Sequence, residues 1–336
     1  MSIRYVGNFP PPYGGVTIKN DLLCGELSKR TDIKRLRKPA WMPNILYKAC
    51  GMLTIFSPAQ QMIVGISSRS GKSHRVTQLL YIFRRKVLHR SLYFMMGGTE
   101  TKEVATSKKL LVQYGCYKRI YVEMPSMKEC LLQAGLQNVS VYPNCRKRPQ
   151  ISQKPAFHKD KPLRCVFFSL ISKDKGADTV LAAAKQLPQV QFDFYGVLEP
   201  SFAAEFQQEI PTIPNAQYHG VFPVNGDNVY EKLNEYDLLL LPTRALTEGI
   251  PGVLVEAKIA AVPAIVSDIC YNSEIVEHGI SGIVLKENTT PALAAAIAAL
   301  DTDREQLYRL KQGALRSAEK YYIENYLEEI LKVLET

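Results

Sequence analysis

Apolar runs alternate with amphipathic stretches along the second half of the chain. Most of these runs are rich in Val, Ile, Leu or Phe, and turn residues bound them: 164–170, 191–196, 216–221, 237–243, 263–268 and 281–285. Stretches with helical spacing lie between them: 178–187, 201–210, 229–236 and 252–261. Strands that alternate with helices of about ten residues predict right-handed βαβ units and a parallel sheet.

The first half repeats this alternation less regularly. Its strand-like runs are 2–7, 61–67, 91–96, 118–122 and 139–142. Its stretches with helical spacing are 16–30, 75–90, 103–114 and 126–134. We therefore expect an α/β chain of two Rossmann-like, doubly wound domains. Ligands of such folds bind beyond the carboxyl ends of the strands, so the expected site is a cleft between the two domains.

The predicted organisation has four parts. An N-terminal domain covers 1–148, a polar, Pro-bearing linker covers 149–162, and a C-terminal domain covers 163–318. The last part, 319–336, is expected to form a helix that packs back toward the N-terminal domain. Four leucine and isoleucine residues share one face of that helix: Leu327, Ile330, Leu331 and Leu334.

Composition excludes several classes of protein. The chain has 336 residues, of which 46% are hydrophobic and 22% charged, as in a soluble protein with a core. No apolar run reaches about 18 residues, so no transmembrane helix is expected, and the first fifteen residues lack the apolar core of a secretory signal. Seven isolated cysteines without a C-x-x-C pair indicate neither a zinc cage nor a disulfide framework, which favours a reducing compartment.

Charge is distributed unevenly. Residues 1–150 contain 25 Lys and Arg against 7 Asp and Glu, whereas residues 151–336 contain 17 against 25. A basic half suits nucleic acid, an anionic membrane or a phosphorylated ligand, and a basic face kept only for solubility also fits. Two basic groups stand beside apolar residues: 34–38, which precedes Trp41, Met42, Ile45 and Leu46, and 84–90. This combination suits the headgroup boundary of an anionic membrane, although a solvated charged face above a buried helix is the alternative.

The segment 241–268 carries the most specific chemistry. It has the pattern strand, Gly/Pro loop, helix, strand, with Glu248 in the loop, Pro251 at the expected first helical position and Glu256 one turn later. A helix N-terminus attracts phosphate, whereas carboxylates repel it but accept hydrogen bonds from sugar hydroxyls. A nucleotide sugar carries both phosphates and sugar hydroxyls, so it suits such a site. In the alternative interpretation, Glu248 is a helix N-terminal carboxylate and Glu256 a surface residue.

This segment resembles the E-x7-E signature of glycosyltransferase family 4, the retaining enzymes of GT-B fold, and is most similar to bacterial members that build O-antigens and capsules. The similarity extends to 236–243, to 274–285, and to 169–176 (SLISKDKG), which resembles the phosphate-binding turn of the family. The resemblance implies that Glu248 contacts the donor sugar, Glu256 the ribose, and Lys175 the diphosphate. The backbone between the two glutamates would contact the donor through Gly249, Ile250, Pro251 and Gly252.

Weaker parts of the resemblance suggest further site residues. Gly14 and Gly15 match the glycine loop after the first strand, on the donor side. Met96, Gly97 and Gly98 match a His-Gly-Gly motif on the acceptor or cleft side. Two positions depart from the family: Leu170 stands where a phosphate-binding Arg is expected, and Met96 where a His is expected. Three alternatives stay open for the missing cation: Arg244 replaces it, a lysine of the N-terminal domain replaces it, or the donor binds less tightly. His219, at a strand end, is a further candidate for donor binding.

The resemblance implies a retaining glycosyltransferase of hexosyl or N-acetylhexosaminyl type. It would use a UDP- or GDP-sugar and a lipid-linked or growing surface-polysaccharide acceptor, with no cofactor and no metal. We expect a cytoplasmic protein that is peripheral on the inner face of a bacterial membrane. Two alternatives stay open: a catalytically impaired member that binds sugar nucleotide or scaffolds a glycan assembly complex, and a two-Rossmann sugar-nucleotide epimerase.

The remaining motifs in the sequence do not indicate a function. The segment 65–73 resembles a P-loop but has Ser70 where the motif requires Gly. The D-x-D at Asp301–Asp303 follows an Ala-rich helix, so we predict that it caps the next helix. The five histidines show no metal-binding spacing. No nucleic-acid recognition motif accompanies the basic charge, so nucleic acid is not an expected partner.

Overall fold

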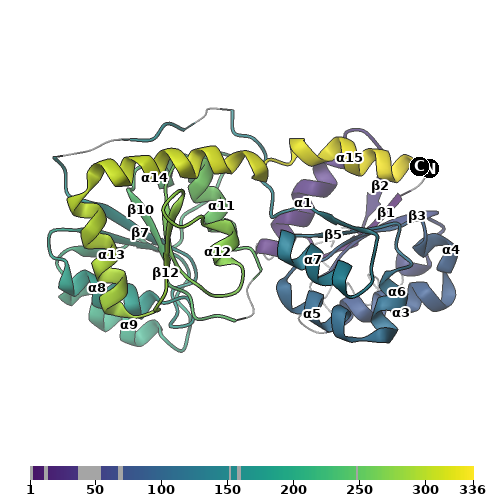
Figure 1. Ribbon diagram of the computed structural model, residues 1–336, viewed down its shortest axis with the longest axis horizontal. Coiled ribbons are helices and arrows are strands. Elements are labelled where there is room, and N and C mark those ends of the chain that lie inside the picture. Colours follow the sequence, from purple (N-terminus) through teal and green to yellow (C-terminus); the bar gives the residue numbers. More distant parts are fainter. Residues whose placement is uncertain are drawn as a thin grey trace, which may run out of the picture. The chain divides into compact units, whose positions relative to one another are not determined.

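The computed structural model describes residues 3–10, 14–36, 54–66, 71–150, 153–156, 160–246 and 249–336. Contacts divide the chain into two units (Figure 1). Unit 1 comprises Met1–Arg148 and Tyr322–Thr336, and unit 2 comprises Pro149–Tyr321.

Unit 1 contains a parallel sheet with the strand order β2-β1-β3-β4-β5-β6. Its strands are β1 (Ile3–Gly7), β2 (Ile33–Arg35), β3 (Gln61–Gly65), β4 (Leu92–Phe94), β5 (Arg119–Val122) and β6 (Val139–Val141). Five of the strands lie within runs predicted from the sequence. The edge strand β2 was missed because its three residues, Ile-Lys-Arg, carry no recognisable apolar pattern.

The helices of unit 1 cover the sheet. They are α1 (Gly15–Leu27), α3 (Lys72–Phe83), α4 (Arg85–Leu88), α5 (Gly98–Thr106), α6 (Lys108–Tyr114), α7 (Pro125–Gln133) and α15 (Glu324–Glu335), with a short 3-10 turn η1 (Thr54–Phe56). The predicted helix 75–90 is broken at Arg84, whose backbone leaves the helical region, and 103–114 is broken at Ser107, which caps α6. The apolar face of α15 packs into the core of unit 1.

Unit 2 contains a second parallel sheet, ordered β12-β11-β10-β7-β8-β9. Its strands are β7 (Arg164–Phe168), β8 (Gln191–Tyr195), β9 (Ala216–Tyr218), β10 (Leu238–Leu241), β11 (Ala264–Ser267) and β12 (Gly282–Leu285). Each lies within a predicted run, and β10 is buried along its whole length, as expected for a sheet covered on both faces.

The helices of unit 2 lie between these strands and after them. They are α8 (Ala177–Gln186), α9 (Ala203–Glu209), α10 (Asn228–Asn234), α11 (Gly252–Ile259), α12 (Asn272–Ile275), α13 (Thr290–Thr302) and α14 (Arg304–Ser317), with 3-10 turns η2 (Ile210–Thr212) and η3 (Ala318–Tyr321). The Asp303 carboxylate accepts a hydrogen bond from the Gln306 amide at 2.8 Å, so the predicted capping role of the D-x-D segment is confirmed.

The described residues give two negative findings. Among them, no helix combines the length and apolar character that a membrane crossing requires. Nor do three or more His, Cys, Asp or Glu side chains within the described ranges come together as a set of metal ligands.

A buried lysine stands out in unit 2. Lys258, on α11, is only 2% exposed, and its Nζ donates to Ser281 Oγ at 2.9 Å and to Ser317 Oγ at 2.6 Å. Burial and, secondarily, the nearby charge of Lys320 lower the pKa of Lys258 to about 7, while Glu277 opposes this shift. A lysine held by hydroxyl groups in this way is costly to bury in its charged form.

We predict that Lys258→Met stabilises the protein in a pH-dependent manner. Between the folded pKa of about 7 and the unfolded value of 10.5, the unfolded wild type binds more protons, so its stability rises with pH across that window. The advantage of the methionine variant is therefore largest below pH 7, on the order of a few kcal/mol, and shrinks toward pH 10. Melting temperatures of the variant and the wild type at pH 6 and pH 9.5 measure this advantage, and Lys185→Met, at an exposed lysine, is the control. A difference in melting temperature that is the same at both pH values would contradict the burial argument.

Candidate functional site

The candidate site of unit 2 begins at the point where its strand order reverses. Strands β7 and β10 are parallel neighbours, but the chain leaves β7 toward β8 on one side and continues from β10 toward β11 on the other. The loop after β7 (169–176) and the loop after β10 (242–251) therefore start at the same edge of the sheet, on either side of the switch point. In doubly wound folds, ligands bind in the crevice at this position.

The loop after β7 forms a tight turn that leads into α8. The Gly176 amide donates to Lys173 O at 3.0 Å, the Ala177 amide donates to Ser172 O at 3.1 Å, and the Lys175 amide donates to Ser172 Oγ at 3.2 Å. Gly176 has a φ of +82° and caps α8, and a Cβ at this position would lie 2.2 Å from Pro242 O. Only glycine therefore allows the two loops to approach this closely. The turn contains Lys175, the residue predicted to reach a diphosphate.

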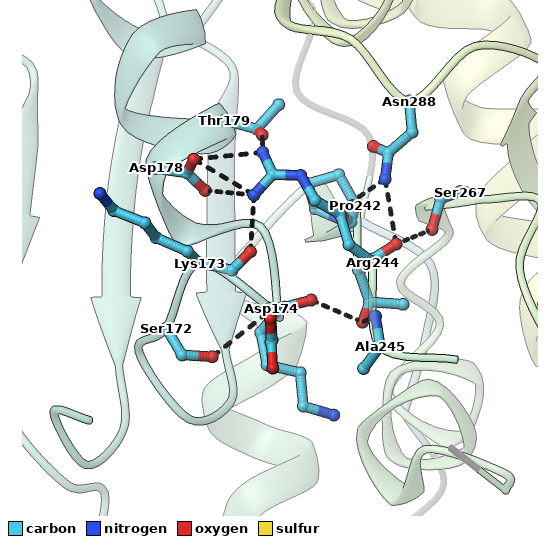
Figure 2. Close-up of polar contacts among 12 residues, drawn as sticks. Ser172, Lys173, Asp174, Asp178, Thr179, Pro242, Arg244, Ala245, Ser267 and Asn288 are labelled. Carbon is cyan, nitrogen blue, oxygen red and sulfur yellow. Dashed lines mark hydrogen bonds and ion pairs between the residues drawn. The ribbon is translucent and has the colours of Figure 1, made fainter. Parts of the chain in front are cut away.

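Arg244 joins the two loops across the switch point (Figure 2). Its guanidinium donates to both carboxylate oxygens of Asp178 at 3.0–3.2 Å, to Lys173 O at 2.6 Å, and to the Thr179 hydroxyl. Its backbone amide donates to Asp174 O at 2.7 Å. The sequence singled out Arg244 as a substitute phosphate-binding cation, but in the structure its guanidinium binds groups of the protein itself. A role in donor binding stays a prediction, and the observed contacts instead indicate that Arg244 positions the turn.

Polar side chains also hold the start of the loop after β10 in place. The Ser267 hydroxyl donates to Thr243 O at 2.6 Å, and the Asn288 amide donates to Pro242 O at 3.2 Å and Thr243 O at 3.0 Å. The Thr243 hydroxyl donates to Asp174 O at 3.1 Å and accepts from the Ala245 amide. The sequence did not predict this network, because partners that come from four separate segments leave no local pattern.

The loop after β10 continues to the N-terminus of α11. Pro251 is the N-cap with φ −60°, one position before the expected place, and it supplies no capping side chain. Gly249 and Gly252 are partly exposed and Ile250 is buried, while Glu256 lies one turn into the helix and is partly exposed. The predicted catalytic residue Glu248 lies outside the described residues. The structure thus brings the backbone of 249–252 and Glu256 to the same edge of unit 2 as the turn 169–176.

His219 and Leu170 lie elsewhere around this edge. The His219 ring stacks on Tyr195 with a centroid separation of 4.7 Å, and its Nε2 lies 2.7 Å from an Asp193 carboxylate oxygen. These contacts give His219 partners within its own sheet, and the predicted contact with a donor stays a prediction. Leu170 is exposed in the turn, at the position where the resemblance leads one to expect a cation.

The site residues predicted in unit 1 lie at the carboxyl edge of its sheet. Gly14 and Gly15 are exposed at the start of α1, where the Gly14 amide donates to Thr17 Oγ at 3.0 Å. Met96 is 3% exposed and packs in the core, while Gly97, with φ +116°, is the N-cap of α5, which begins at Gly98. The side chain of Met96 is thus buried rather than displayed, and the acceptor-side role of residues 96–98 stays a prediction.

A buried ion pair near this edge escaped the sequence analysis. Lys19 Nζ, on α1, lies 2.6 Å from Glu123 Oε1, which follows β5, and both side chains are buried. Asn20, next along α1, donates to Asn8 O at 2.9 Å and to Gly65 O at 2.7 Å, and accepts from the Tyr5 hydroxyl. These contacts fasten α1 to the ends of β1, β3 and β5, and so fix the helix N-terminus that carries Gly14 and Gly15.

A family of known proteins matches the segment that contains the candidate site of unit 2. The family model described as "Glycosyl transferases group 1" matches residues 147–316, just over half of the chain. The amylovoran biosynthesis glycosyltransferase of Erwinia amylovora is 27% identical over 174 residues, which is 48% of this chain. That alignment spans only 38% of the relative's own length.

Solved structures with similar folds extend over the whole chain. The Anabaena protein HepE, solved in complex with UDP, superposes with a TM-score of 0.74 at 16% identity, over 100% of both chains. Sucrose-phosphate synthase from Thermosynechococcus elongatus superposes with a TM-score of 0.74 at 14% identity, over 100% of this chain and 98% of the other. At this identity the likeness concerns the fold, and the predicted two-domain α/β fold of GT-B type is confirmed.

We predict that Gly176→Ala is far more destabilising than Gly220→Ala in the same unit. Both glycines have positive φ (+82° and +75°), which costs alanine about 1 kcal/mol, but only at Gly176 would the new Cβ collide with backbone. The collision adds about 2 kcal/mol or more, because Pro242 O belongs to the facing loop and has little freedom to move. Urea unfolding of both variants measures the difference, and equal losses would show that the two loops are not held at this distance.

Proposed function

Because this chain belongs to the glycosyl transferases group 1 family, we propose that it is a retaining glycosyltransferase. It moves a hexosyl or N-acetylhexosaminyl group from a UDP- or GDP-sugar to a lipid-linked or growing surface-polysaccharide acceptor of O-antigen or capsule type. The observation that carries the proposal is the switch-point edge of unit 2, where the turn 169–176 and the N-terminus of α11 lie within the matched segment.

The donor diphosphate is held, in this proposal, by groups that carry or mimic positive charge. Lys175 and the backbone N–H groups of Gly249, Ile250 and Gly252 supply them, and the dipole of α11 adds to the same potential. Negative charge grows on the departing diphosphate in the transition state, so donors fixed beforehand in the protein stabilise that state more than the ground state. We propose that these groups suffice without a metal ion, in which case EDTA leaves the rate unchanged.

The two glutamates of the E-x7-E pair bind the sugars of the donor. Glu248 orients the transferred sugar and Glu256 accepts hydrogen bonds from the ribose hydroxyls, roles that rest on the resemblance of their segment to glycosyltransferase family 4. His219 and Gly14–Gly15 are further donor contacts in this proposal, and residues 96–98 contribute to acceptor binding. In the transfer step, the bond from the anomeric carbon to the diphosphate breaks. The acceptor oxygen bonds to the same face of that carbon and gives its proton to the leaving diphosphate.

The basic charge of the first half supports a membrane location for the protein and for its acceptor. The similarity to an amylovoran biosynthesis glycosyltransferase supports a polysaccharide product. We propose that the acceptor is carried by a membrane lipid, and that the basic first half holds the protein on the anionic inner face of the membrane. The protein is then a peripheral, cytoplasmic enzyme that needs no nucleic-acid partner.

A donor screen tests the proposal. Incubation of the purified chain with common UDP- and GDP-sugars should release nucleotide diphosphate slowly from one donor, because water replaces the missing acceptor. Glu248→Ala should lower kcat about 100-fold, because a misoriented sugar is poorly placed for reaction. Glu256→Ala should raise KM about tenfold with a smaller effect on kcat, because it loses hydrogen bonds that form already in the ground state.

The control for this screen is Glu287→Ala, which removes an exposed carboxylate of the same unit and should leave both constants unchanged. A nucleotide that binds without turnover of any donor, even with lipid-linked acceptors added, would identify the catalytically impaired alternative instead. A chain that binds no nucleotide at all would overturn the assignment of the donor site.

We predict that Arg244 and Asp178 act as one unit. Arg244→Gln and Asp178→Asn should each raise the donor KM about tenfold, because either change removes the ion pair that holds α8 and the turn before it against the loop after β10. The double variant should be no worse than Arg244→Gln alone, since that substitution already removes the contact with Asp178. If Arg244 instead binds the diphosphate directly, Asp178→Asn will leave KM unchanged while Arg244→Gln raises it.

A further inference from the structure

An apolar surface is exposed where α3 ends in unit 1. Ile82 and Phe83, on the last turn of α3, are 58% and 63% exposed, and Phe56 of η1 is 52% exposed. The Phe56 and Phe83 rings lie 6.1 Å apart and are tilted by 58°. We call these three side chains the Phe83 surface. Exposed apolar clusters of this kind mark interaction sites.

A partly buried hydrogen-bond network holds the residues of the Phe83 surface together. The Arg84 guanidinium donates to Ile55 O at 2.8 Å, to Ser57 O at 2.5 Å and to Ala59 O at 2.7 Å. One side chain thus ties the segment around η1 to the end of α3. Arg84 belongs to the basic group 84–90 in the sequence. In the structure its guanidinium positions the apolar residues, whereas Arg85, Lys86 and Arg90 of the same group are exposed to solvent.

Exposed basic residues stand close in sequence to the Phe83 surface. Arg85, Lys86 and Arg90 follow it in α4 and the turn after α4, and all three are exposed. Lys72 and Arg75 are exposed on the first turn of the same helix α3. Between Asp32 and Glu100 the sequence has no acidic residue and twelve Lys or Arg, so no carboxylate of that stretch offsets the charge.

We propose that the Phe83 surface inserts into the interface of an anionic lipid bilayer, with Ile82, Phe83 and Phe56 at the acyl boundary and the flanking basic residues on the headgroups. This inference rests on the proposed function in one respect, the membrane-borne acceptor, and it names the contact that brings the enzyme to that acceptor. Exposed apolar side chains with basic residues on the same segment match an anionic bilayer, which offers an apolar layer beneath negative groups. Single-stranded nucleic acid needs aromatic faces free for stacking, whereas the two rings here tilt against each other and the third residue is aliphatic.

Vesicle sedimentation with the full chain tests the proposal. Vesicles of phosphatidylcholine with about 30% phosphatidylglycerol should bind the wild type, and vesicles of phosphatidylcholine alone should bind it at least tenfold more weakly. Ile82→Ser with Phe83→Ser should weaken binding to the anionic vesicles by at least about tenfold. Arg85→Gln with Lys86→Gln should weaken it by about 25-fold, since each basic residue near such a surface contributes about fivefold.

The matched control is Ile280→Ser, which removes an apolar side chain of similar exposure (55%) from a turn of unit 2 and should bind vesicles as the wild type does. Melting temperatures check that each variant is folded. Donor hydrolysis in vesicle-free buffer should be unchanged in the serine variant, because the Phe83 surface lies outside the donor-binding residues.

The proposal is overturned if the serine variant binds anionic vesicles as strongly as the wild type. It is also overturned if the wild type binds single-stranded DNA as strongly as anionic vesicles and both pairs of substitutions weaken the two kinds of binding equally. The donor assay separates this proposal from the proposed function. A chain that binds vesicles as predicted but turns over no donor, even with lipid-linked acceptors added, refutes the transferase and leaves the membrane surface standing. A chain that hydrolyses a donor but binds no vesicles refutes the membrane surface alone.

Discussion

The close approach of two loops at the carboxyl ends of β7 and β10 is the constraint on which the candidate site depends. Gly176 permits that approach, because any Cβ there would collide with Pro242 O. Arg244 then joins the loops through Asp178, Thr179 and Lys173 O. The pair is partly exposed, so its contribution to global stability is small. Its effect is local: it fixes the backbone that carries Lys175 relative to the loop that leads into α11.

Both units hold the loops at the carboxyl ends of their strands in place through polar side chains, but the side chains differ. In unit 2, a cation and several hydroxyl and amide groups hold the loops at the switch point of the sheet. In unit 1, the Asn20 amide bridges Asn8 O and Gly65 O, and the buried pair of Lys19 and Glu123 fastens α1 to the end of β5. Buried polar groups of this kind are costly unless fully paired, so they hold a single arrangement of the loops. Rigid loop ends suit a site that must present backbone amides in fixed positions.

The fold could be predicted from the sequence where the pattern is local. Strands of unit 2 such as β10 (Leu238–Leu241) were found because they are uninterrupted apolar runs, and Asp303 was recognised as a cap from its place between two helices. Strand β2 and the breaks at Arg84 and Ser107 were missed, because short or charged segments depend on tertiary contacts. For the same reason the sequence suggested the chemistry of Arg244 but not its partner, since Asp178 lies 66 residues away.

Hydrogen exchange of backbone amides, with and without UDP or GDP, tests the central claim most directly, because the claim is that particular amides hold the diphosphate. The account predicts that one of these nucleotides slows exchange in peptides that cover 169–177 and 246–256, while the amides of α13 and α14 are unaffected. Protection of neither peptide at saturating nucleotide, or protection confined to unit 1, would contradict the placement of the donor site at the switch point of unit 2.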